Sequence, residues 1–356
     1  MISKENSPKI EVLEGSKSDF RLQINDKIVY RMQINEIIYG SFEINEPVIL
    51  ELLNSKAVQR VKRVSHIGHP LGMVPKNAHY FTRYDHCFGV MLLLRKLGAG
   101  LEEQIAGLLH DISHTAFSHV ADHLFADPTV QNYQDKVHLE YLMKTDIAGI
   151  LEKYKVNLKK IAHLESFTML ENELPDICAD RLDYTFREYY WADPEAVGYC
   201  LSNLIVYNGE IAFKDKPSAL KFAEGYLKCN RESWMYPEYI LRYILLADAI
   251  RLGLDKNSLK KEDITFGDDE TAIAKLRSMN DPKVNKILNA LSSDIKFELN
   301  DKKEGVQLLT KFRYVDPKFI SGNELVRLSS VDATYKAKID EEKRFYSKPM
   351  YAKVEL

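Results

Sequence analysis

Histidine and aspartate residues gather in one short part of the chain. Five of the ten histidines lie between positions 110 and 138, among several aspartates. They are His110, His114, His119, His123 and His138, with Asp111, Asp122 and Asp127. Imidazole nitrogens and carboxylate oxygens are common ligands of zinc, iron and manganese, and histidine also transfers protons near neutral pH. Metal-dependent chemistry with proton transfer is therefore the first expectation.

The doublet His110-Asp111 directly follows an apolar run that ends in Leu108-Leu109. Burying two polar side chains at the end of an apolar helix costs several kcal/mol unless a partner satisfies them, and a divalent cation would do so. We expect one helix to run from Leu101 through the doublet. Neighbouring residues on a helix point about 100° apart, so one ion can reach both only at the helix end, and other segments must complete its shell.

Two further segments offer the missing ligands. Upstream, His86 lies at the start of an apolar helix in Arg83-Tyr84-Asp85-His86. Downstream, Asp180 lies within Cys178-Ala179-Asp180-Arg181-Leu182-Asp183-Tyr184, which also has a helical pattern. With the doublet, these segments supply two imidazoles and two carboxylates.

These residues form three ordered motifs: R-x-x-H (Arg83, His86), H-D-x-x-H (His110, Asp111, His114) and D-R-x-D-Y (Asp180, Asp183, Tyr184). The order resembles the HD-domain phosphohydrolases. It is most similar to the deoxynucleoside triphosphate triphosphohydrolase branch, which includes the sterile-alpha-motif and HD-domain enzyme. A lone H-D pair is common, whereas three motifs in this order are specific. The likeness extends over about Asn35 to Asp316 and includes Ala116-Phe117-Ser118-His119.

The resemblance implies one divalent metal ion held by His86, His110, Asp111 and Asp180. It implies catalytic roles for His114 and His138 beside the scissile phosphate, and for Asp122 in orienting a histidine. The metal could be iron, manganese, zinc or magnesium, because a mixed imidazole and carboxylate set suits all four to different degrees. A second ion on His114 and His138 is an alternative.

The resemblance also implies a set of substrate-binding residues: Arg83, His119, Arg181, Tyr184, Glu188 and His66. Arg83, Arg181 and Tyr184 match groups that hold the phosphate chain, which suits a guanidinium fork and a phenol donor. The implied reaction is hydrolysis of a nucleotide phosphoester, with a dNTP giving a deoxynucleoside and inorganic triphosphate. His66 replaces a glutamine that contacts the sugar, and Glu188 replaces an aspartate, so base and sugar specificity stay open.

Two other functions and several structural roles compete with this interpretation. The protein could be an HD phosphomonoesterase or nuclease that acts on other nucleotides, or a nucleotide-binding regulator with little turnover. Arg83 could pair with Asp85 or Asp180 instead of a phosphate, and His114 and His138 could serve only to orient other groups.

The composition narrows the classes of partner. The 356 residues include 49 basic and 52 acidic ones, for a formal net charge of -3, so no overall positive field would gather nucleic acid. No apolar run of about 18 residues is present, and the N-terminus lacks the apolar core of a signal peptide, so we expect no membrane contact and a cytoplasmic location. The resemblance implies a homo-oligomer, a dimer or larger.

The elements that must position these residues are mainly helical. We expect an HD-domain helical core at 46–256, after an N-terminal β-rich segment at 1–45 with a hairpin at 20–30, and before a C-terminal α+β appendage at 257–356. Apolar spacing predicts helices at 84–97, 137–154, 174–190 and 220–254, and strands at 306–309 and 350–354. Pro237 should start or kink a helix.

Overall fold

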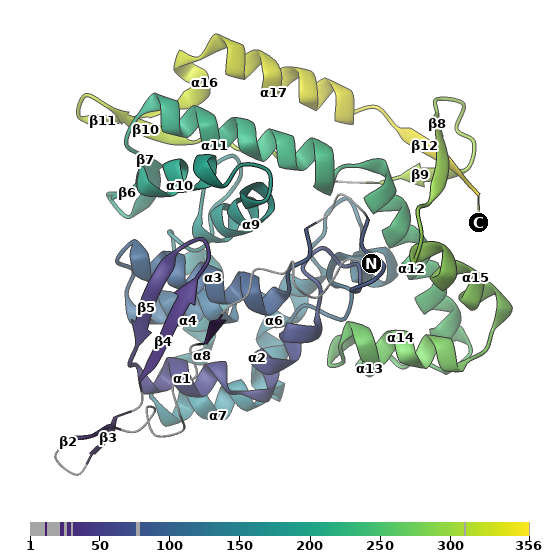
Figure 1. Ribbon diagram of the computed structural model, residues 1–356, viewed down its shortest axis with the longest axis horizontal. Helices are drawn as coiled ribbons and strands as arrows, with labels where there is room; N and C mark the ends of the chain where they lie inside the picture. Colours follow the sequence, from purple (N-terminus) through teal and green to yellow (C-terminus); the bar gives the residue numbers. More distant parts are fainter. Residues whose placement is uncertain are drawn as a thin grey trace.

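The computed structural model describes residues 11–12, 22–24, 27–29, 31–75, 79–309 and 311–355. Helices dominate this part of the chain, and the strands form small sheets at its edges (Figure 1). This confirms the predicted class: mainly α, with a β-rich N-terminal segment and a C-terminal α+β region. Within the described residues, no helix has both the length and the apolar character needed to cross a membrane.

Short strands precede the helical core. They are β1 (Glu11–Val12), β2 (Leu22–Ile24), β3 (Lys27–Val29), β4 (Met32–Glu36) and β5 (Gly40–Ile44). The predicted hairpin at 20–30 is confirmed, because β2 and β3 pair antiparallel; its turn lies outside the described residues. Strand β4 pairs antiparallel with both β1 and β5.

Three helices position the motif residues: α3 (Arg83–Lys96), α4 (Leu101–Leu109) and α9 (Ala179–Tyr190). Helix α3 contacts both α4 and α9 and is buried along most of its length. It begins with a reciprocal cap, in which the Thr82 side chain accepts from the Asp85 backbone and the Asp85 carboxylate accepts from the Thr82 backbone. It ends before Gly98, which adopts a positive φ of 81° that favours glycine.

Other helices surround these three: α1 (Pro47–Leu53), α2 (Lys56–Arg60), α5 (Asp122–Phe125), α6 (Tyr133–Lys144), α7 (Asp146–Lys153), α8 (Leu158–Ala162) and α10 (Pro194–Ser202). Three 3-10 turns, η2 (Val61–Arg63), η3 (Ser118–Ala121) and η4 (Leu164–Ser166), join them. The helix predicted at 137–154 is two helices, because the backbone is extended at Thr145.

Two other predicted helix bounds also differ from the structure. Helix α9 begins at Ala179 and not at 174, since Cys178 before it is extended. Helix α4 ends at Leu109, so the doublet lies in the turn that follows and not within the helix. The helical region predicted at 220–254, in which Pro237 was expected to start or kink a helix, corresponds to α11 (Lys216–Cys229), a π-helical turn η5 (Asn230–Trp234) and α12 (Pro237–Asp255). Pro237 starts α12, as predicted.

A second apolar cluster packs α12 against α13 (Lys261–Thr265), α14 (Asp269–Ser278) and α15 (Pro282–Leu291). These helices form one end of the molecule in Figure 1. Here α14 begins at an Asp268 cap, whose side chain accepts from the Thr271 backbone.

The C-terminal region contributes strands to two sheets. Strands β8 (Lys296–Asn300), β9 (Val306–Leu308) and β12 (Met350–Glu355) form one, in the order β8-β12-β9, which confirms the two predicted strands. The other has the order β11-β10-β7-β6 and joins β10 (Lys318–Ser321) and β11 (Glu324–Arg327) to β6 (Leu204–Tyr207) and β7 (Glu210–Phe213). Helices α16 (Leu328–Val331) and α17 (Ala333–Tyr346) follow, with α17 beside α11 (Figure 1).

The β6-β7 hairpin interrupts a region that was expected to be helical throughout. Because β10 pairs with β7, the C-terminal region completes a sheet that begins within the central region. The bounds 1–45, 46–256 and 257–356 remain a prediction.

Candidate metal centre and active site

The four predicted metal ligands come from three separate segments and meet at one point. His86 lies in the first turn of α3, Asp180 in the first turn of α9, and His110 with Asp111 in the turn after α4. His86 Nε2 lies 3.1 Å from His110 Nε2 and 2.9 Å from Asp180 Oδ1. Asp111 Oδ2 lies 3.5 Å from His86 Nε2 and 3.6 Å from His110 Nε2.

These separations suit a single cation. For ligand bonds of about 2.1 Å, neighbouring donor atoms are about 3.0 Å apart in an octahedral shell and about 3.4 Å apart in a tetrahedral one. The distances from the two Nε2 atoms to each other and to the aspartate oxygens cover this range: the shortest is 2.9 Å, the longest is 3.6 Å, and His110 Nε2 lies 3.4 Å from Asp180 Oδ1.

The hydrogen bonds of the two imidazoles provide an independent test of this fit. His110 Nδ1 lies 2.8 Å from the Gly107 carbonyl, which can only accept, so this nitrogen carries a hydrogen. His86 Nδ1 lies 2.8 Å from the Asp183 carboxylate, which favours the same tautomer. The two Nε2 lone pairs then face one another beside two carboxylates, and a divalent cation is the partner that removes this repulsion.

The electrostatics of the cluster agree with its need for positive charge. Burial opposes a charge on His110, yet Asp111 and Asp180 beside it raise its pKa to about 9. Burial likewise works against ionised carboxylates, but Arg83 and His110 hold the pKa of Asp111 well below its usual range. The pKa of Asp180 is also lowered, against burial, by His110 and His86.

A buried group of polar side chains holds His86 in place. The Asp183 carboxylate, which contacts His86, also accepts from Tyr39 Oη at 2.7 Å and from Arg187 Nε at 2.8 Å. Arg187 in turn lies 3.1 Å from Glu36 Oε1. Such outer contacts fix the tautomer and orientation of a ligating histidine. The sequence interpretation gave Asp183 no role of its own, although it is part of the third motif.

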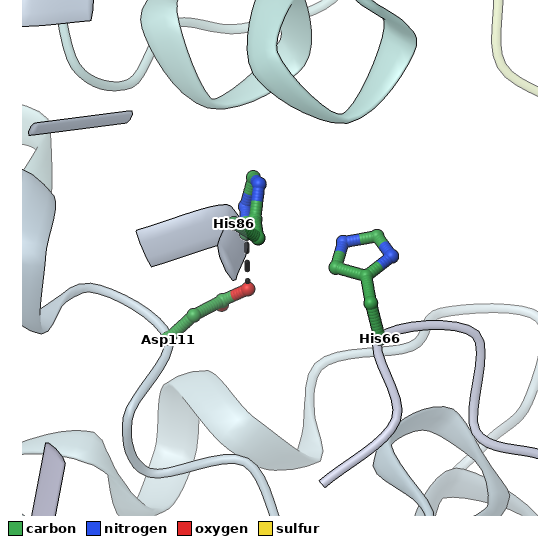
Figure 2. Close-up of side chains that lie close together, drawn as sticks. All are labelled: His66, His86 and Asp111. Atoms are coloured by element: carbon green, nitrogen blue, oxygen red, sulfur yellow. Dashed lines mark ion pairs between the residues drawn. The ribbon is translucent and has the colours of Figure 1, made fainter. Parts of the chain in front are cut away.

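His66, a predicted substrate-binding residue, lies beside this centre on a different segment. Figure 2 shows the His86 ring and the Asp111 carboxylate pointing toward one another, with the His66 ring standing next to them. The ring centroid of His66 lies 4.7 Å from that of His86 and 4.5 Å from that of Phe81, and the His66 ring stacks on the Phe81 ring. Within the part of the chain that the structure describes, its buried Nδ1 has no hydrogen-bond partner.

The three predicted catalytic residues all line the same cavity. His114 Nε2 lies 3.3 Å from Asp111 Oδ1, and its pKa falls to about 3 through burial and the Arg83 charge. His138 Nδ1 bonds Ser113 Oγ at 2.8 Å, whereas its buried Nε2 has no partner among the described residues. Asp122 contacts His119 Nδ1 at 3.1 Å, so it does pair with a histidine.

Three residues that were predicted to bind phosphate make polar contacts with other groups of the protein. Arg83 pairs with Asp111, and not with Asp85 or Asp180; its remaining donors reach Ser118 Oγ and the His66 carbonyl, each at 3.0 Å. The Arg181 guanidinium bonds the Asp176 carbonyl at 2.6 Å and the Asn172 carbonyl at 3.0 Å. Tyr184 Oη lies 3.0 Å from Tyr226 Oη.

A cavity of about 1110 Å³ joins these groups. Eleven of the thirteen predicted site residues line it: His66, Arg83, His110, Asp111, His114, His119, Asp122, His138, Asp180, Arg181 and Tyr184. Of the other two, His86 is fully buried. Glu188 is buried next to Ser233, with Oε2 unpartnered in the described structure, and burial raises its pKa to about 7.

Sequence reasoning missed several residues that line or support the cavity: Ser113, Gln134, Asn230, Trp234, Lys311 and Arg313. The hydroxyl of Ser113 contacts His138 Nδ1, and Gln134 Nε2 donates to the same hydroxyl oxygen at 2.8 Å. Lys311 and Arg313 belong to the C-terminal region and are far from the motifs in the sequence. The only sequence feature that could have indicated them is the positive charge at two alternate positions.

Comparison with known proteins places this geometry in a family. The model of the HD domain matches residues 83–187, which include all four predicted metal ligands. A Bacillus subtilis protein, YdhJ, is 32% identical over 296 residues, covering 80% of this chain and 87% of YdhJ. The metal-dependent phosphohydrolase cns2 of Cordyceps militaris is 30% identical over 285 residues, covering 76% of this chain and 80% of cns2. The chain belongs to the HD-domain phosphohydrolases.

Other similarities bear on fold and on the predicted branch. A phosphohydrolase from Bacteroides thetaiotaomicron superposes with a TM-score of 0.61 at 14% identity, over 92% of this chain and all of that one, which supports the fold. The deoxynucleoside triphosphate triphosphohydrolase SAMHD1 of Danio rerio is 30% identical over 94 residues, only 22% of this chain and 15% of that protein. Membership of the HD-domain family is thus supported by matches over most of the chain, whereas the likeness to the triphosphohydrolase branch rests on a match over 22% of the chain.

Proposed function

We propose that this protein hydrolyses a phosphoester bond of a nucleotide with the help of one divalent metal ion, and that its reaction converts a dNTP to a deoxynucleoside and inorganic triphosphate. The observation that carries the proposal is the cluster of donor atoms from His86, His110, Asp111 and Asp180, three of which line a cavity of about 1110 Å³. Pockets of roughly 300–1000 Å³ hold drug-sized ligands, so this one is large enough for a nucleoside triphosphate.

The metal would be held by His86, His110, Asp111 and Asp180, whose facing lone pairs fit a cation. A divalent cation in such a site polarises a phosphoryl oxygen and makes water a stronger nucleophile at neutral pH. The mixed imidazole and carboxylate set suits iron, manganese and zinc, and it suits magnesium less readily.

His138 is the best placed group for donating a hydrogen bond to the leaving oxygen. Its Nδ1 contacts Ser113 Oγ, and that oxygen already accepts from Gln134 Nε2, so the serine hydrogen is available to donate to Nδ1. The imidazole would then carry its own hydrogen on Nε2, the buried nitrogen without a partner in the described chain. His114 and His119, the latter paired with Asp122, line the same cavity and could orient water or substrate.

A second reaction, release of orthophosphate from a nucleotide monoester, is favoured by a specific observation. The match to cns2, a metal-dependent phosphohydrolase, covers 80% of that protein, whereas the match to the triphosphohydrolase covers 15% of that protein. His66 and Glu188 also stand where the triphosphohydrolase branch has other residues for the sugar.

The products separate these reactions. Purified protein supplied with manganese would be incubated with dNTPs, NTPs and nucleoside monophosphates, and products identified by chromatography and phosphorus NMR. Inorganic triphosphate is the expected product, and orthophosphate from monophosphates alone would replace the first reaction with the second. Asp111→Ala should lose both activity and metal, while Asp127→Ala, which alters an exposed aspartate, should retain both. Nucleotide-dependent thermal stabilisation without any turnover would instead identify a regulator and reject the proposal.

A further inference from the structure

The connection from β9 to β10 reaches the cavity from outside the HD region. Its residues 311–317, here called the strap, link the sheet that contains β9 to the different sheet that contains β10. Figure 1 shows these two sheets on different sides of the molecule, beside α12 and α11 respectively. Two basic residues of the strap, Lys311 and Arg313, line the cavity.

The intervening aromatic residues have other contacts. Phe312 stacks on Tyr346 of α17 with ring centroids 5.1 Å apart, and Lys343 Nζ of the same helix lies 4.1 Å from the Tyr314 ring centroid. Side chains that alternate in this way point to opposite sides of an extended chain. The strap therefore turns its basic residues toward the cavity and its aromatic residues toward α17.

Both ends of the strap are attached to loops that border the cavity. Lys311 Nζ donates to the Val130 carbonyl at 3.1 Å, next to the lining residue Gln131. At the other end, Asp316 N donates to the Pro175 carbonyl at 2.8 Å, next to the lining residue Leu174. Its position is thus defined by contacts and not by chain connectivity alone.

Arg313 differs from the other arginines of the cavity. The guanidiniums of Arg83 and Arg181 are engaged by carboxylates and carbonyls of the protein. No hydrogen bond or ion pair engages the Arg313 guanidinium within the described residues. Its charge is nevertheless close to other lining groups: burial lowers the pKa of His119 and Arg313 contributes in the same direction.

We propose that Lys311 and Arg313 form an anion site for the outer phosphates of a polyphosphate chain whose inner phosphoryl group lies at the metal centre. The inference rests on the proposed function, in which a phosphoryl group lies at that centre. A chain of three phosphates carries several negative charges and can extend from the centre to the strap. Orthophosphate carries one phosphoryl group and cannot occupy both places. Charge-assisted hydrogen bonds to phosphate are strong and, for arginine, can be bidentate.

Calorimetry with two inorganic probes tests this directly. Manganese-loaded full-length protein, freed of excess metal, would be titrated with inorganic triphosphate and separately with orthophosphate, and its metal content measured after each titration. Arg313→Gln and Lys311→Gln should each weaken triphosphate binding by about 10-fold, the usual value of a charged hydrogen bond, and leave orthophosphate binding within about twofold. Arg344→Gln, a change in an exposed arginine on α17, is the matched control and should alter neither.

Each outcome decides the question. Unchanged triphosphate affinity in Arg313→Gln, or equal losses for both probes, would overturn the strap site. Arg313 has no protein partner to lose among the described residues, so Arg313→Gln should unfold at the wild-type temperature. A lower midpoint temperature of unfolding would also contradict the assignment of Arg313 to an anion site. A strap that binds triphosphate in a protein that hydrolyses no nucleotide would reject the proposed function and retain the anion site. Nucleotide hydrolysis by a protein whose triphosphate affinity does not change in the strap variants would support the proposed function and reject the anion site.

Discussion

Gly89→Ala should damage the metal centre without touching a metal ligand. Gly89 lies in α3, one turn after His86, and a Cβ added there would be 2.0 Å from Arg187 Nη2 and 2.1 Å from Asp183 Oδ1. Since ordinary van der Waals contact begins at 3.4 Å, the Asp183 carboxylate would have to move by roughly 1.3 Å. Both neighbours are fully buried in a network with Tyr39 and Glu36, so neither can move freely.

The movement would break the contact that orients His86. The bond from His86 Nδ1 to Asp183 Oδ2 is 2.8 Å long, and a shift of this size takes it beyond hydrogen-bond distance. Loss of the carboxylate partner of a ligating histidine commonly costs about 10-fold to 100-fold in metal affinity. We expect a loss in that range, together with a lower free energy of unfolding by about 1–3 kcal/mol from the crowding.

Competition with a fluorescent chelator would measure metal affinity, and chemical denaturation would measure stability. The chain offers a matched control, because Gly149 in α7 and Gly198 in α10 have no atom within 4 Å of an added Cβ. Alanine at either position should leave metal affinity unchanged and stabilise its helix by about 0.5–1 kcal/mol. Wild-type metal affinity in Gly89→Ala, with or without a loss of stability, would refute the argument that Asp183 holds His86 for the metal.

Two further predictions concern His138 and Glu188. Ser113→Ala removes the only hydrogen-bond partner that His138 Nδ1 has among the described residues. We expect kcat to fall about 10-fold and KM to stay within twofold of the wild-type value. An equal change in kcat and KM, or a change in KM alone, would contradict a positioning role for Ser113. Burial raises the folded-state pKa of Glu188 to about 7, above its unfolded value, so this group lowers stability progressively as pH rises from about 4 to 7. Glu188→Gln should therefore gain stability over the wild type across that interval, by at most about 3 kcal/mol, and the difference should level off above pH 7; denaturation at several pH values would measure it, and a constant difference would exclude the shift.

Much of the metal centre could be predicted from the sequence because the ligands follow strong local signals. His86 stands next to a helix start marked by Thr82 and Asp85, and the doublet follows an apolar run that ends where α4 ends. Family resemblance then connected segments that local patterns cannot bring together. The structure places all four predicted ligands at one point, even though the helix bounds at the doublet and at α9 were shifted by a few residues.

Pairings between distant residues could not be predicted in this way. Arg83 was expected at a phosphate or near Asp85 or Asp180, and it pairs with Asp111, because the packing of α3 against α4 decides which carboxylate it meets. The β6-β7 hairpin was missed for a related reason. Its strands are four residues each, and one edge of the hairpin is completed by β10, more than a hundred positions later.

These pairings also change what a motif match says about substrate binding. Arg83 and Arg181 keep their places in the motifs, but their donors are engaged by Asp111 and by the carbonyls around position 175. A phosphate would have to compete with those contacts, whereas it would meet Arg313 without such competition among the described residues. Conversely, Ser113 was assigned no role from the sequence, yet it contacts His138. The proposed metal chemistry therefore rests on the shared motifs, and the proposed selection of the phosphate chain rests on a segment outside the matched HD domain.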